Sequence, residues 1–162
     1  MMARKLSAIL IRSNQIMRKC LLVLAAVALL PFVAAGDDDT KKELERFRGT
    51  WRFESIEMEG KAVPADVLKD AVLTLDGDKF TVKVPMDTYK GTFKVDVSKK
   101  PKTIDVTYTE GPEKGKTSRG IYELEGDTYK VCMDPEGKQR PTKFETKKDS
   151  PFILEVLKRE KK

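Results

Sequence analysis

The sequence of 162 residues predicts an all-β fold, a small antiparallel up-and-down β-barrel of about 8–10 strands that follows a short N-terminal helix. Two patterns predict it. Short segments in which apolar and polar residues alternate recur between residues 50 and 158, and turns rich in Gly, Pro and Asp separate them. No stretch typical of a long helix interrupts the series. Closure into a barrel is favoured because an open sheet of this many strands would leave two long edges unpaired.

Residues 1–35 have the pattern of a secretory signal peptide. Five basic residues and no acid occupy the first 19 positions, and an uncharged run of 16 residues then extends from Cys20 to Ala35. We expect cleavage after Ala35, where small residues accumulate, and export to the periplasm or the cell exterior. The run is shorter than the roughly 20 residues of a membrane span, so we expect no stable span after cleavage. A start at Met17 would leave a more compact signal.

The net charge of +6 belongs mostly to that segment. Without residues 1–35 the chain keeps 27 basic and 26 acidic side chains, so it has no electrostatic footprint for nucleic acid, and we expect no nucleic-acid partner. The basic tail, residues 158–162, is interpreted as a solvated terminus in preference to an anion-binding site.

The composition argues against catalysis. The chain has no His, which removes the usual general base, the Ser-His-Asp and Cys-His pairs and every His-containing zinc site. Carboxylate pairs such as Glu57 with Glu59, or Glu123 with Glu125, alternate with apolar residues and are therefore expected on the solvated face. We expect no enzyme, no catalytic residue, no cofactor and no metal.

Two glycine-containing motifs are interpreted as turns. Residues 111–117 resemble a phosphate-binding loop but have three residues between the glycines instead of four and lack the following helix. Glu113 would also place a carboxylate where the phosphate should lie. Residues 76–78 lack the ligand spacing of a calcium loop. Both segments are expected to connect strands.

The domain organisation is an acidic leader over residues 36–43 and a single barrel domain over residues 44–162. Thr40 is placed to cap a short helix over residues 41–48. In the first long strand, apolar residues change parity after Phe53, which predicts a β-bulge near Ser55.

Later strands are expected in pairs. Asp76-Gly77-Asp78 and Glu125-Gly126-Asp127 predict two hairpins. The expected elements after the first strand are a short helical piece over 64–70 and strands over 73–75, 80–84, 89–95, 104–108, 121–125, 129–133, 142–146 and 152–158.

After cleavage Cys132 is the single remaining cysteine, so no internal disulfide is possible. It has no His partner, and we expect it to serve as a small side chain in a strand.

The best candidates for a binding site are polar-tipped aromatic residues of inward parity, with two arginines to orient a ligand. For any one of them ordinary core packing is the competing interpretation. The candidates are Trp51, Phe53, Phe80, Tyr89, Phe93, Tyr108, Arg119, Tyr122, Tyr129 and Arg140.

A series of short motifs resembles one known family. The motifs are Gly49-Thr50-Trp51, Gly60-Lys61-Ala62-Val63-Pro64, Leu75-Asp76-Gly77-Asp78-Lys79-Phe80, Gly91-Thr92-Phe93, residues 99–105, residues 111–117, residues 120–127 and Arg140-Pro141-Thr142. Together they are similar to a family of small, lipocalin-like domains of unassigned activity that is abundant in planctomycete bacteria. The resemblance covers roughly residues 44–159. It implies a calycin-like barrel in which Trp51 packs at the closed end beneath Lys158 or Arg159, and it supplies no catalytic residues. The domain is shorter than typical lipocalins and lacks their usual disulfide, which argues against a large open cavity.

Two functions are compatible with these observations. The first is an exported, non-enzymatic module that binds a small, largely apolar ligand in or at the mouth of the barrel. The second is a structural or protein-interaction domain with a filled barrel that acts through its surface. A cavity would favour the first, and a solid core the second.

Overall fold

The computed structural model describes residues 36–161; the expected signal peptide and its cleavage site lie outside them. The elements in chain order are α2 (Gly36–Phe47), β1 (Gly49–Met58), β2 (Lys61–Ala62), α3 (Ala65–Leu68), β3 (Val72–Asp76), β4 (Lys79–Lys83), β5 (Thr88–Asp96), β6 (Lys102–Glu110), β7 (Thr117–Glu125), β8 (Thr128–Asp134) and β9 (Ile153–Arg159).

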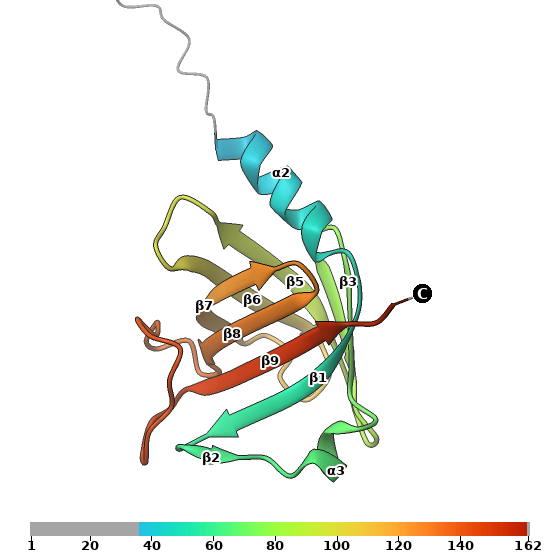
Figure 1. Ribbon diagram of the computed structural model, residues 1–162, viewed down its shortest axis with the longest axis vertical. Helices are drawn as coiled ribbons and strands as arrows, with labels where there is room; N and C mark the ends of the chain where they lie inside the picture. Colours follow the sequence, from blue (N-terminus) through green and yellow to red (C-terminus); the bar gives the residue numbers. More distant parts are fainter. Residues whose placement is uncertain (1–35, 162) are drawn as a thin grey trace, which may run out of the picture. The chain divides into compact units, whose positions relative to one another are not determined.

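The strands form a closed antiparallel up-and-down barrel (Figure 1), as the sequence predicted. Each strand from β3 to β9 pairs with the next strand along the chain, β1 pairs with β3, and β1 also pairs with β9 to close the ring. The eight-stranded ring leaves only the two-residue β2 outside it, as an extension beside the end of β1. Closure therefore removes the two long edges that an open meander would expose.

The predicted hairpins and bulge are present. β3 and β4 are joined at Gly77 with a φ of 58°, and β7 and β8 at Gly126 with a φ of 54°. Both turns need the left-handed conformation that glycine adopts without steric cost. The pairing of β1 with β9 shifts register between Phe53 and Ser55. The bulge changes the parity of β1 at the place where the apolar pattern changes.

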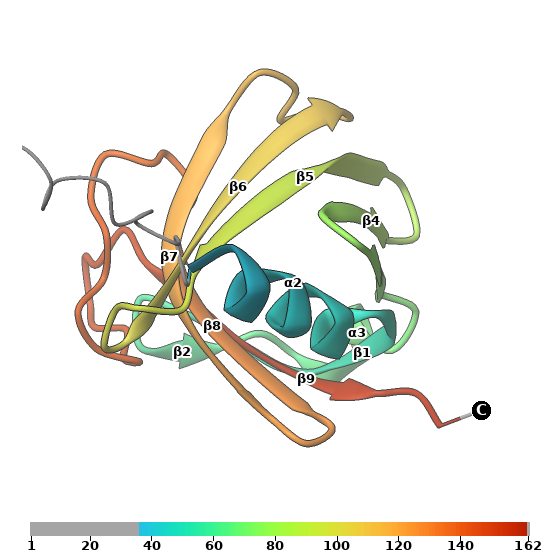
Figure 2. The ribbon, with the colours of Figure 1, turned by 90° about the horizontal axis from the view of Figure 1, so that it is seen from above.

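Helix α2 differs from the prediction in its start. The expected leader over residues 36–43 is helical, and the helix ends at Phe47 instead of residue 48. Acidic side chains in a first helical turn are favoured by the helix dipole, and Asp38 also pairs with Lys42 at 2.9 Å. The aspartates that suggested a solvated segment therefore also suit a helix N-terminus. Seen from above in Figure 2, α2 lies across one end of the ring of strands.

The segment between β8 and β9 was predicted to hold a short strand over residues 142–146, and that prediction is wrong. Residues 135–152 form no strand. The Thr146 hydroxyl donates to the Glu57 carboxylate and accepts from the Gly60 amide at 3.0 Å, and Lys130 lies 4.8 Å from the centre of the Phe144 ring. Side chains attach this loop to the barrel, whose eight ring strands are each already paired on both sides.

The helix also supplies part of the core. Phe47, at the last position of α2, is fully buried and makes edge contacts with Phe93 and Tyr129 at ring-centre distances of 5.5 and 5.1 Å. These contacts fill the end of the barrel beneath α2. The remaining interior is less completely filled.

Candidate functional site

A cavity of about 350 Å³ lies inside the barrel. Its walls come from the inward faces of strands β1, β3–β6, β8 and β9, together with the end of α2 and two loops. The lining residues are Phe47, Phe53, Leu73, Leu75, Phe80, Val82, Tyr89, Phe93, Ile104, Val106, Tyr108, Glu113, Tyr129, Met133, Pro135, Ile153 and Glu155. The lining is mostly apolar and aromatic, with three phenol groups and two carboxylates, which is the usual composition of a small-molecule site.

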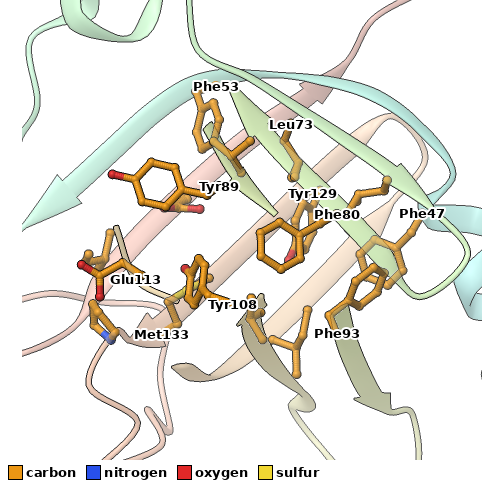
Figure 3. A pocket seen from close by; sticks show the side chains of 17 residues that line it. Phe47, Phe53, Leu73, Phe80, Tyr89, Phe93, Tyr108, Glu113, Tyr129 and Met133 are labelled. Atoms are coloured by element: carbon orange, nitrogen blue, oxygen red, sulfur yellow. The ribbon is translucent and has the colours of Figure 1, made fainter. Parts of the chain in front are cut away.

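The two ends of the cavity differ in character (Figure 3). Phe47 and Phe93 lie together at one end, while Tyr89, Met133 and Glu113 lie toward the other. The hydroxyl of Tyr89 and the carboxylate of Glu113 thus lie on the side of the cavity away from Phe47 and Phe93, which belong to the packed end of the barrel beneath α2. The cavity therefore has an apolar end and a polar end.

The tyrosines contribute both ring surface and hydroxyl groups. Tyr108 makes edge contacts with Phe80 and Tyr89 at ring-centre distances of 5.4 and 6.3 Å. Within residues 36–161, neither the Tyr89 hydroxyl nor the Tyr129 hydroxyl has a hydrogen-bond partner. Burial raises the pKa of Tyr129 well above its ordinary value and also raises the pKa of Tyr108. Both phenols are therefore neutral at physiological pH and can donate or accept a hydrogen bond.

Glu155 on β9 places a carboxyl group inside this apolar lining. Its strand neighbours of the same parity are Ile153, which also lines the cavity, and Leu157, which is fully buried. The carboxyl group of Glu155 makes no hydrogen bond or ion pair with any other residue of the described chain. Burial without a compensating partner raises its pKa to about 7. A carboxyl group in this position changes its charge near neutral pH.

Glu113, the second carboxylate of the lining, is in a different situation. It belongs to the loop between β6 and β7, and Lys116 of the same loop lies 2.7 Å from it. Lys116 also contacts Glu136 at 3.3 Å. The segment that resembled a phosphate-binding loop is therefore a hairpin connection, and its carboxylate has a nearby cation.

The structure brings six of the ten predicted site residues to the cavity. These are Phe53, Phe80, Tyr89, Phe93, Tyr108 and Tyr129.

The other four candidates are elsewhere. Trp51 and Tyr122 are fully buried in the packed end, and Arg119 is exposed. Arg140, in the loop after β8, donates to the carbonyls of Ile104 at 2.9 Å and Gly120 at 2.6 Å, and to the carboxylate of Asp105. Arg140 thus attaches that loop to β6 and β7. The binding role of all ten residues stays a prediction.

The packed end contains Trp51 and the basic residue that covers it. The Trp51 indole donates to the Phe47 carbonyl at 2.8 Å, and the Arg159 guanidinium lies 4.1 Å from the indole. Arg159 also donates to the carbonyls of Arg46 and Arg48. Of the two basic residues that the resemblance suggested for this place, Arg159 occupies it, because its planar donor group can both stack on the indole and bond two carbonyls.

Glu43 of α2 is the centre of a satisfied polar cluster at the same end. It is 4% exposed and accepts hydrogen bonds from Lys102 at 2.6 Å, Arg46 at 2.7 Å and the Tyr122 hydroxyl at 3.0 Å. Burial would raise its pKa, but the hydrogen bonds from Lys102 and Tyr122 and the charges of Lys102 and Arg46 together lower it below the ordinary value. The cluster joins the helix to strands β6 and β7.

Cys132 lies in β8 and is buried, as the strand pattern suggested. Its thiol is 3.9 Å from the Glu145 carbonyl, and burial raises its pKa to about 11. At that pKa the thiolate is scarce near neutral pH, which is unfavourable for nucleophilic chemistry.

Sequence reasoning missed the two carboxylates of the cavity. Glu155 has the same strand parity as Ile153 and Leu157, so the alternation in the last strand pointed it inward. The signal was obscured because that strand has apolar residues on both faces. Glu113 is in a loop, where no periodicity indicates direction.

In comparisons with known proteins, no protein-family model, no curated protein and no solved structure matches this chain. Within residues 36–161, no three Cys, Asp or Glu side chains are grouped so that they could hold a metal ion. None of the helices described is both long enough and apolar enough to cross a membrane.

Proposed function

We propose that this protein is an exported, non-enzymatic binding module that holds a small, largely apolar ligand inside its barrel. The observation that carries the proposal is the cavity of about 350 Å³. Its volume falls in the range of small-molecule sites, roughly 300–1,000 Å³. A barrel filled by its own side chains would have no such space. Export is supported by the signal-peptide pattern of residues 1–35.

The composition of the lining supports an apolar ligand with a polar end. Aromatic and aliphatic side chains form most of the wall, and the unpartnered hydroxyls of Tyr89 and Tyr129 offer hydrogen bonds. We also propose kinship with lipocalin-like domains of planctomycete bacteria, which the contact of Arg159 with Trp51 supports.

Native mass spectrometry tests the binding function. The protein is expressed from its full sequence, isolated from the exported fraction and weighed under native and denaturing conditions. We expect an added mass that denaturation releases, or retention of an added apolar probe such as N-phenyl-1-naphthylamine.

A matched pair of variants on β6 links any binding to the cavity. Val106→Phe fills part of the cavity, whereas Thr107→Phe adds the same ring to the exposed face of the same strand. We expect the first variant to weaken probe binding and the second to leave it unchanged. An unliganded mass with no probe retained would contradict the proposal and favour a structural or protein-interaction domain that acts through its surface.

A further inference from the structure

The carboxyl group of Glu155 is the feature of the cavity that apolar ligand binding leaves unexplained. A barrel that only needed an apolar interior would have an aliphatic residue here, as it does at Ile153 and Leu157 on the same face of β9. Instead a half-buried carboxyl group lines the cavity, and it has no hydrogen-bond or ion-pair partner in the described chain. A charge within an apolar lining is unfavourable without a partner, so a partner that enters the cavity would relieve the cost.

The charges around the cavity favour a cationic partner over an anionic or neutral one. The lining contains no Lys or Arg among residues 36–161. Glu113, the other carboxylate, is paired with Lys116. Glu155 is therefore the uncompensated acidic group, and an anionic ligand would meet it without any cation to offset the repulsion.

The aromatic walls also favour a cation. Rings of Phe53, Phe80, Tyr89, Tyr108 and Tyr129 line the same space. An aromatic face attracts an ammonium group through the ring quadrupole, and aromatic cages bind alkylated ammonium groups in this way. A carboxylate and several aromatic rings around one cavity thus offer two independent attractions to the same chemical group.

We propose that the cavity binds a small organic cation, an amine or alkylated ammonium with an apolar body, and that Glu155 is its anchor. The inference rests on the proposed binding function and specifies its ligand class. The apolar body would lie against the phenylalanines, and the ammonium group would contact Glu155 and the phenol hydroxyls.

The titration of Glu155 gives the proposal a pH dependence. Burial raises the pKa of Glu155 to about 7, so at pH 5 the group is mostly protonated and at pH 8 mostly ionised. The titratable groups that line the cavity with it are the phenols of Tyr89, Tyr108 and Tyr129, and Glu113, which has Lys116 beside it. Burial raises the pKa of Tyr108 and of Tyr129, so these two phenols stay neutral over this range. An amine that is protonated over the whole range should therefore bind more tightly at pH 8 than at pH 5.

Three probes that share one body and differ in charge test the proposal: 4-phenylbutylamine, 4-phenylbutanol and 4-phenylbutyrate. Calorimetric titrations use the full-sequence product at pH 5 and pH 8. At pH 8 we expect the amine to bind most tightly and the carboxylate least. Glu155→Gln keeps the size of the side chain and should weaken amine binding by about 10- to 100-fold, the range for loss of a hydrogen bond to a charged group. Alcohol binding should change little.

Glu123→Gln is the control, because it removes an exposed carboxylate on β7 and should leave all three affinities unchanged. Circular dichroism confirms folding of each variant, and the pH dependence of the unmodified protein provides a test that requires no variant. Alcohol binding without any preference for the amine would overturn the role of Glu155 and leave the binding function standing. Preference for the carboxylate would also overturn it. Failure of all three probes to bind would contradict both proposals.

Discussion

Glu43 is buried and Glu155 is half-buried in the wall of the cavity, and the surroundings of the two carboxyl groups are opposite. Glu43 lies at the end of the barrel that α2 covers, where three side chains donate hydrogen bonds to it. Glu155 lies in the cavity and has no partner in residues 36–161. The pKa of Glu43 is lowered and that of Glu155 is raised to about 7.

The difference distinguishes a structural acid from an acid available to a ligand. Burial acts on both carboxyl groups in the same direction, because it disfavours the charged form. Only at Glu43 do donors reverse the effect. A fully hydrogen-bonded group has little left to offer a ligand, whereas the unpartnered group at Glu155 has all of its hydrogen-bonding capacity.

The largest effect is expected when the satisfied acid is removed. Glu43→Ala leaves Lys102 and the Tyr122 hydroxyl without their acceptor, and breaking a buried ion pair on one side costs about 3–5 kcal/mol. The free energy of unfolding is measured by urea titration at pH 7. Glu45→Ala, on the same helix but exposed, is the control and should have little effect. Equal small losses would show that the cluster around Glu43 contributes no more than a surface pair.

Removal of the charge at Glu155 should stabilise the protein, in contrast to removal of Glu43. A rise of the Glu155 pKa from 4.5 to about 7 corresponds to a cost of up to about 3 kcal/mol at high pH. Because the folded state binds this proton more tightly, stability falls as the pH rises from 4.5 to 7. Glu155→Gln should therefore raise the free energy of unfolding at pH 8 and change it little at pH 4.

The dependence of the free energy of unfolding on pH distinguishes the contribution of Glu43 from that of Glu155. The folded pKa of Glu43 is below its ordinary value, so its contribution is present above about pH 4.5 and is lost only as the pH falls further. Between pH 5 and pH 8 the slope of stability against pH should belong to Glu155 and should diminish in Glu155→Gln. A slope that persists in this variant would contradict the assignment.

The smallest effects are expected for two matched hydroxyl deletions. Tyr122→Phe removes a donor to the Glu43 carboxylate, which should cost about 1–3 kcal/mol. Tyr129→Phe removes a hydroxyl that has no hydrogen-bond partner in the described chain, so its effect on unfolding should be close to zero. Equal losses measured by urea unfolding would mean that the two regions do not differ in the way the contacts indicate.

Local pattern was sufficient for much of the fold. Alternation located the strands, the Gly77 and Gly126 turns followed from the conformations that hairpins require, and the parity change near Ser55 located the bulge. The start of α2 and the false strand over residues 142–146 could not be predicted in the same way. In both places, short-range composition was ambiguous. The acidic segment is helical with a local pair of Asp38 and Lys42, whereas contacts of Phe144 and Thr146 with the barrel hold residues 142–146 in a loop.

The candidate site was predictable only in part. Inward parity identified six aromatic residues of the cavity, but it could not separate them from Trp51 and Tyr122, which have the same parity and are packed against α2. Whether an inward ring lines a space or fills it depends on the sizes of its neighbours on other strands. That information is absent from any single strand.

The sequence by itself determined the direction of the residues in the strands that alternate clearly, and the two hairpin turns, because these depend on neighbours along the chain. The tertiary structure decided that β1 pairs with β9, that donors from β6 and β7 surround Glu43, and that a space remains around Glu155. These properties depend on residues 59 and 79 positions apart in the case of Glu43. Only closure of the barrel brings such residues within hydrogen-bonding distance or leaves a cavity between them.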